Sequence, residues 1–137
     1  MAKTIRDLMT KNPCAIDADQ PVAHAAKMMR DENVGLAPIV EGQKLVGTLT
    51  DRDIAIRVVA EGKDPQKTTV REVATTSVVT IDPNQDLAEA LRLMAQNQVR
   101  RLPVVEDGRL AGIVAQADVA KHASDEQTGE VVEEISK

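Results

Sequence analysis

The sequence matches itself without a gap at a shift of 65 residues, and this internal repeat limits the fold more than any other feature. The register places segment 4–8 (TIRDL) on 69–73 (TVREV), and it continues until Asp53 falls on Asp118. A self-match of this length indicates one structural unit that occurs twice, and such units bury their apolar faces by packing on one another. We therefore expect two similar half-domains that pack about an approximate two-fold axis.

Each repeat predicts the same elements: a short N-terminal helix, then strand, helix, strand, strand and helix. Thr4 and Thr69, each followed three residues later by an acid, are typical of helix starts. Gly-containing turns predict two hairpins, with strands at 36–40, 45–50, 102–105 and 110–114. Two further extended stretches are expected at 14–16 and 79–81. Apolar residues at helical spacing predict the main helices: Val22, Ala25, Ala26, Met29, Leu87, Ala90, Leu91 and Met94.

These patterns predict an α+β fold and a division of the chain. The first repeat is expected at 1–60, a polar linker at 61–68 and the second repeat at 69–124. The acidic tail at 125–137 is expected to be mobile, with docking as a short helix through Val131, Val132 and Ile135 as the alternative. Because the 137 residues include no Phe, Trp or Tyr, we expect an aliphatic core packed between the two repeats.

Composition also narrows the function classes. The net charge of −5 and the missing aromatic residues disfavour binding to nucleic acid. Cys14 is the single cysteine, so no intramolecular disulfide forms, which fits a reducing compartment. No segment has the roughly 20 apolar residues of a membrane span. We therefore expect a soluble, cytoplasmic protein without a membrane partner.

Two segments, LVGTLTDRD at 45–53 and VRRLPVV at 99–105, are similar to the CBS-domain pair, named for cystathionine β-synthase and often called a Bateman module. The resemblance runs from Thr4 to about Ser124 and includes short stand-alone bacterial members such as the hypoxic-response type. It implies tandem CBS repeats, each β-α-β-β-α, packed sheet to sheet about a pseudo-two-fold axis. It also implies adenosine ligands (AMP, ADP, ATP or S-adenosylmethionine) in the clefts, homodimers, and no catalytic domain.

The clearest candidate ligand site is the end of segment 47–53, where a strand leads into a helix. Exposed amides at a helix start suit phosphate oxygens, and the resemblance assigns the phosphate to Thr50 and the ribose to Asp53. The same Thr-x-x-Asp pattern is also an ordinary capping box, so both interpretations stay open. The second repeat has Ala115 in place of the threonine but keeps Asp118. We therefore expect unequal sites, with the Asp118 site the weaker.

Further candidate contacts lie in the second repeat. Arg100 and Arg101 precede a strand, and the resemblance implies that basic residues there reach phosphates; a solvated charged edge or a dimer contact is the alternative. A ligand near Asp53 is also expected to meet the stretch around Val79. Adenine would then lie against aliphatic side chains, since no aromatic residue is available.

Catalytic and metal-binding interpretations have little support in the sequence. His24 is expected to face solvent, and His122 is expected near a helix end, where a cation favours the helix dipole. Cys14 has no nearby histidine or second cysteine, and a small buried strand residue is the expectation. Met28 and Met29 are expected to fill the core. No Walker-type loop and no metal spacing occur, so we expect a non-enzyme with no required cofactor.

Two functional hypotheses follow. In the first, a regulatory module binds an adenosine nucleotide in the cleft between its repeats and passes the change to an unidentified partner protein. In the second, a dimeric interaction protein keeps the fold while its ligand site is vestigial. The alanine at position 115 and the missing aromatic residues favour the second hypothesis.

Overall fold

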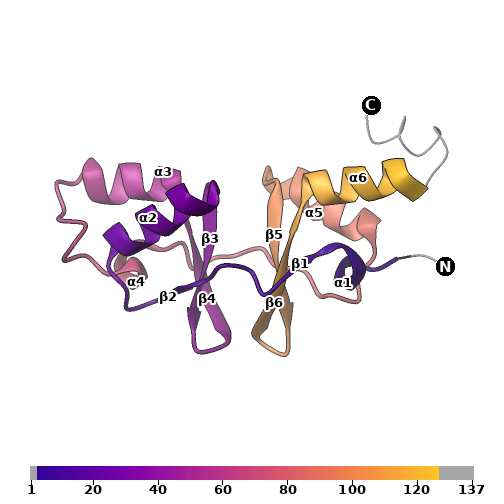
Figure 1. Ribbon diagram of the computed structural model, residues 1–137, viewed down its shortest axis with the longest axis horizontal. Coiled ribbons are helices and arrows are strands. Elements are labelled where there is room, and N and C mark those ends of the chain that lie inside the picture. The colour runs from indigo at the N-terminus through magenta and orange to yellow at the C-terminus, as the bar shows by residue number, and fades with distance from the viewer. Residues whose placement is uncertain (1–2, 127–137) are drawn as a thin grey trace. The chain divides into compact units, whose positions relative to one another are not determined.

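The computed structural model describes residues 3–126, which divide into two compact units (Figure 1). The repeat-1 unit comprises residues 14–78 and 108–110, and the repeat-2 unit comprises residues 3–13, 79–107 and 111–126. No helix in the described range combines the length and hydropathy that a bilayer crossing requires.

The repeat-1 unit combines a mixed sheet with helices. Strand β3 pairs antiparallel with β4 and parallel with β2. The hairpin and the first main helix are confirmed as predicted, whereas the expected strand at 14–16 begins only at Ile16. The elements are β2 (Ile16–Asp17), α2 (Val22–Glu32), β3 (Leu36–Glu41), β4 (Lys44–Thr50), α3 (Asp51–Ile54), the π-helix η1 (Ala55–Val59) and α4 (Val70–Val73).

The repeat-2 unit has the corresponding elements. Strand β6 pairs with β5 and antiparallel with β1. The extended stretch expected at 79–81 is reduced to a single parallel bridge between Ile81 and Val104. The elements are α1 (Ile5–Leu8), β1 (Thr10–Lys11), α5 (Leu87–Asn97), β5 (Arg101–Glu106), β6 (Arg109–Ala115) and α6 (Gln116–Glu126). Of the tail expected at 125–137, positions 125 and 126 continue α6, and the rest lies outside the described residues.

Each unit has its own apolar core, and no Phe, Trp or Tyr contributes to either, as expected. In the repeat-1 unit, Met29 and Ile39 belong to a buried cluster that also includes Val70 and Val73 of α4. In the repeat-2 unit, the buried cluster is joined by Ile5 of α1. Aliphatic side chains alone therefore fill two small cores, each closed by a short helix from the other repeat.

Each short N-terminal helix packs with the other repeat. Helix α1 precedes repeat 1 in sequence but lies in the repeat-2 unit, and α4 precedes the rest of repeat 2 but lies in the repeat-1 unit. Helix α4 contacts β4 in the repeat-1 unit, and α1 contacts α6 in the repeat-2 unit (Figure 1). The Val70 amide donates to the Gln20 carbonyl, and the Ile5 amide donates to the Gln85 carbonyl, both at 2.9 Å. These pairs are equivalent in the repeat register, so the exchange is reciprocal.

Ion pairs follow the same pattern. The Arg71 guanidinium contacts the carboxylates of Asp19, at 3.2 Å, and of Glu41. Its equivalent, Arg6, contacts the carboxylate of Glu106 at 2.6 Å. The compact units thus follow packing, whereas the boundaries predicted at 1–60, 61–68 and 69–124 follow the sequence register and stay a prediction.

Candidate functional site

The candidate site begins at Thr50, where β4 ends and α3 starts. The Thr50 hydroxyl oxygen accepts from the Asp53 amide at 3.0 Å, and the Asp53 Oδ2 atom accepts from the Thr50 amide at 2.9 Å. The two residues therefore form a capping box, one of the two interpretations of this motif. The box leaves the hydroxyl proton of Thr50 and the second carboxylate oxygen of Asp53 outside these two bonds.

Asp53 has a cationic neighbour that the sequence analysis missed. Arg57 lies one turn further along, and its Nη2 atom is 3.9 Å from the Asp53 Oδ1 atom. The Arg57 Nη1 atom donates to the carbonyl oxygen of Val73, the last residue of α4, at 2.9 Å. The spacing of Asp53 and Arg57, four residues apart in a helical segment, was the available signal.

The second repeat retains half of the capping arrangement. The Ala115 amide donates to the Asp118 Oδ2 atom at 3.0 Å, in the manner of Thr50 and Asp53. Alanine has no side-chain oxygen to return the hydrogen bond, so the start of α6 lacks the hydroxyl that marks the first site.

Three further candidate residues lie in the repeat-2 unit with Asp118. Arg100 and Arg101 are exposed, and neither guanidinium forms a hydrogen bond or an ion pair with the part of the chain that the structure describes. The Arg100 carbonyl accepts from the Gln116 amide at 2.8 Å. This bond brings the Arg100 backbone to the start of α6, and Asp118 lies two residues after Gln116 in the same helix. Val79 is half-buried against the repeat-2 core.

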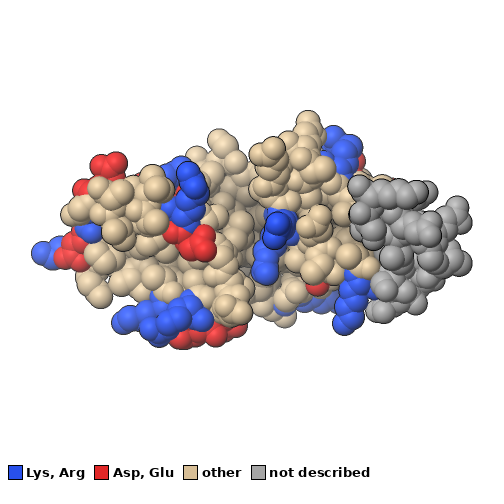
Figure 2. Space-filling model, turned by 90° about the horizontal axis from the view of Figure 1, so that it is seen from above, with Lys and Arg blue, Asp and Glu red and all other residues tan. Residues whose placement is uncertain are grey.

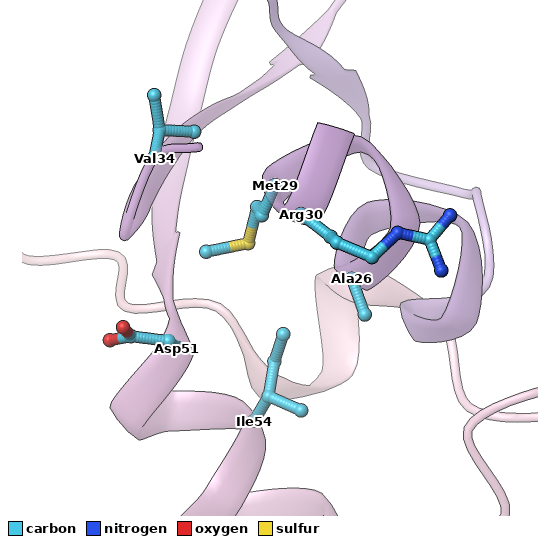
Figure 3. Close-up of a pocket in the computed structure, with 6 residues that line it drawn as sticks. All are labelled: Ala26, Met29, Arg30, Val34, Asp51 and Ile54. Carbon is cyan, nitrogen blue, oxygen red and sulfur yellow. The ribbon is translucent and has the colours of Figure 1, made fainter. Parts of the chain in front are cut away.

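A hollow of about 310 Å³ lies between α2 and α3 in the repeat-1 unit (Figure 3). The Met29 thioether extends into it, while the Arg30 guanidinium turns away. Neither Thr50 nor Asp53 lines this hollow, although their chain neighbours Asp51 and Ile54 do. Its lining residues are Ala26, Met29, Arg30, Val34, Asp51 and Ile54.

Among the histidines and the cysteine, Cys14 requires a correction. His24 is exposed, as predicted. His122 lies before the last turn of α6, which continues to Glu126, and it is buried, with 8% of its surface accessible. Cys14 is exposed instead of buried, because β2 starts two residues later. Local desolvation, followed by the charge and hydrogen bond of Glu32, raises the pKa of the Cys14 thiol.

Metal and nucleic-acid sites receive no structural support within the described residues. No group of three or more His, Cys, Asp or Glu side chains in residues 3–122 is placed to hold a metal ion. On the face shown in Figure 2, acidic and basic side chains are interspersed with large uncharged areas, without one continuous basic field.

The CBS domain family matches the chain twice, at residues 5–60 and 70–125. Among curated proteins, the chain is 44% identical over 134 residues to the CBS domain-containing protein YhcV of Bacillus subtilis, covering 97% of this chain and 95% of that protein. It is 40% identical over 120 residues to Hypoxic response protein 1 of Mycobacterium tuberculosis, covering 87% of this chain and 84% of that protein.

Solved structures share the same fold. Hypoxic Response Protein I with two coordinated zinc ions superposes with a TM-score of 0.81 at 39% identity, over 88% of this chain and 98% of that one. CBSX2 in complex with AMP superposes with a TM-score of 0.78 at 25% identity, over 90% of this chain and 98% of that one. The CBS domain pair of MJ0100, in complex with 5′-methylthioadenosine and S-adenosylmethionine, superposes with a TM-score of 0.75 at 29% identity, over 88% of this chain and 98% of that one.

The repeat, the order of elements within each repeat, the capping boxes and these similarities agree. The chain belongs to the CBS-domain family and carries two CBS repeats.

Proposed function

We propose that this chain is a non-catalytic regulatory module that binds an adenosine nucleotide and passes the change to a partner protein, acting as a cytoplasmic homodimer. The observation that carries the proposal is that CBS pairs with the same fold hold AMP, 5′-methylthioadenosine or S-adenosylmethionine. A regulatory ligand acts only through its different affinities for two states of the protein, so that difference limits the size of the response.

The proposed first site is built around Thr50 and Asp53. The second oxygen of Asp53 accepts hydrogen bonds from ribose hydroxyls, which selects nucleosides over inorganic phosphate. The Thr50 hydroxyl provides a donor for a phosphate oxygen. The amides of Asp51, Arg52 and Asp53 already donate to the Gly35 carbonyl, the Asp51 carboxylate and the Thr50 hydroxyl. Val79, Arg100 and Arg101 are proposed as further contacts, since the two guanidinium groups are exposed and bind phosphates well.

The proposed second site, at Asp118, is weaker. Asp118 keeps the carboxylate for a ribose, but Ala115 removes the hydroxyl donor that Thr50 provides at the equivalent position. We therefore expect one competent adenosine site for each chain and a second that is weak or empty.

The first test is spectroscopic. Because the chain has no Trp or Tyr, adenine that copurifies with the protein is visible by its own ultraviolet absorbance. Calorimetric titration with AMP, ATP and S-adenosylmethionine then identifies the preferred ligand. A clean spectrum and no binding at millimolar ligand would overturn the proposal.

The site assignment is tested with Asp53→Asn. Asparagine retains an oxygen that accepts from the Thr50 amide, so the cap survives while the carboxylate charge is lost. The matched control is Asp31→Asn, which removes an exposed carboxylate of the same unit that lies on α2, outside the proposed site. Loss of binding in Asp53→Asn alone supports the assignment, and equal affinities in both variants contradict it.

A second candidate function is a dimeric interaction protein that needs no ligand. The exposed side chains of Ile56 and Val59 on η1, 52% and 70% accessible, favour it, since large apolar groups at a helix surface often mark protein contacts. Light scattering of the Ile56→Ser, Val59→Ser double variant tests it. Loss of the dimer in this variant would assign the dimer contact to η1, and a wild-type dimer that binds no adenosine compound would favour this second candidate.

A further inference from the structure

Arg57 connects the proposed site to α4. Its Nη2 atom lies 3.9 Å from the Asp53 Oδ1 atom, and its Nη1 atom donates to the Val73 carbonyl at 2.9 Å. Since the Thr50 amide occupies the other carboxylate oxygen, Asp53 is held from two sides. A planar guanidinium with two donor groups can make both contacts at once.

The environment of this bridge favours a positioning role. The Asp53 side chain is 13% accessible, so its charge is poorly solvated and its interaction with Arg57 is screened less than at an open surface. Arg57 itself is 47% accessible, which leaves room for its side chain to move when the carboxylate finds another partner. A ligand hydroxyl that donates to Asp53 therefore acts on a carboxylate that is already oriented.

The far end of the bridge is anchored to the sheet. Val73 ends α4, and Thr75 then exchanges two backbone hydrogen bonds with Thr48 of β4, at 2.8 and 2.9 Å. The chain continues to Val78, the last residue of this part of the repeat-1 unit. Arg57 thus links the ligand-binding end of β4 and α3 to the segment that leaves the unit.

We propose that Arg57 is a positioning residue that orients the Asp53 carboxylate for an adenosine ribose and couples its occupancy to the segment at 74–78. The inference rests on the proposed function and deepens it, because it names how the ligand site communicates. A bound ribose further restrains the Asp53 carboxylate that Arg57 already orients, and Arg57 passes this restraint to the end of α4 through the Val73 carbonyl.

The residue at the position equivalent to Arg57 in the second repeat has a different chemistry. The position equivalent to Arg57 is His122, four residues after Asp118 as Arg57 is four residues after Asp53. An imidazole has two ring nitrogens, whereas a guanidinium presents five N–H donors in a planar fork, so the two repeats differ in chemistry at this position. The proposal therefore concerns the first site only.

The test combines AMP calorimetry with hydrogen exchange of residues 74–78 in the full-length protein. Arg57→Gln is expected to weaken AMP binding about tenfold, the usual size of a lost charge-assisted contact. It is also expected to abolish the AMP-induced protection of residues 74–78. Arg57→Lys, which keeps the charge but lacks the planar fork, is expected to recover affinity without recovering the protection.

Arg30→Gln is the matched control, because Arg30 lies in the same unit and bonds to Asp31 instead. Wild-type AMP affinity and protection in Arg57→Gln would overturn the coupling inference and leave the proposed function intact. No AMP binding by the wild-type protein would overturn the proposed function, and the inference with it. If Arg57→Gln does not fold, Arg57→Lys decides alone: wild-type protection in that variant contradicts the bridge.

Discussion

A β-carbon placed on Gly47 would lie 2.8 Å from the carbonyl oxygen of Thr75, closer than real side chains approach backbone atoms. Gly47 is therefore what allows the segment after α4 to lie against β4. The equivalent Gly112 would bring its β-carbon to 2.6 Å from the Thr10 carbonyl oxygen in the repeat-2 unit. Each exchanged segment depends on a glycine in the strand that receives it.

Gly47→Ala is expected to destabilise the protein by about 1–3 kcal/mol, because the added carbon meets backbone that cannot move aside freely. Urea unfolding followed by far-ultraviolet circular dichroism measures the change. Gly35→Ala is the control, since its new carbon would meet only the flexible Asp51 carboxylate, at 3.2 Å. Equal losses in the two variants would show that the Thr75 contact is not the cause.

Substitutions at the two capping positions, 50 and 115, are expected to change the free energy of unfolding in opposite directions. Thr50→Ala removes the acceptor for the Asp53 amide and is expected to cost about 0.5–2 kcal/mol. Ala115→Thr supplies the missing acceptor at the start of α6 and is expected to add up to about 1 kcal/mol. Urea midpoints measure both changes. Thr76→Ala, at an exposed position outside the helices, should change little, and a gain in Thr50→Ala would refute the capping role.

Stability at acid pH is expected to depend on Glu72. The Thr69 amide first, and the Thr69 hydroxyl second, lower the pKa of Glu72 from its ordinary value of 4.5. A carboxyl whose pKa is lower in the folded state stabilises the fold above its unfolded pKa. That contribution is lost as the pH falls through the folded value.

The free energies of unfolding of wild type and Glu72→Gln, measured from neutral pH down through the acid range in which Glu72 becomes protonated, test the expectation. The two curves should differ at neutral pH and converge in acid as wild-type Glu72 becomes protonated. Curves that stay parallel through the acid range would mean that Glu72 does not contribute through its charge.

The reactivity of Cys14 is expected to depend on Glu32. Desolvation and then the Glu32 carboxylate raise the thiol pKa above its ordinary value of 9.0, so less thiolate is present at any given pH. Glu32→Gln should lower the pKa and speed alkylation by iodoacetamide, with the pH–rate curve moved to lower pH. Asp31→Asn, which changes the neighbouring acid, should leave the curve in place. A faster Asp31→Asn variant would contradict the specific role of Glu32.

The sequence by itself determined the duplication, the order of elements and the position of the motifs. Apolar residues at a period of 3.6 predicted α2 and α5, and Gly-containing turns predicted both hairpins. Both signals come from residues close together in the chain, so they report local backbone geometry. The pairing of Thr50 with Asp53 could also be predicted, since both partners lie within one helical turn.

Only the tertiary structure decided which core each short helix joins. The sequence pattern of α4 predicts a buried face, but the same pattern fits the core of either repeat. The choice depends on contacts such as Arg71 with Asp19 and Gly47 with Thr75, which join residues far apart in the chain. The same reason explains the missed link from Arg57 to Val73. Local periodicity specifies an element and its apolar face, whereas its partner is decided by packing between distant segments.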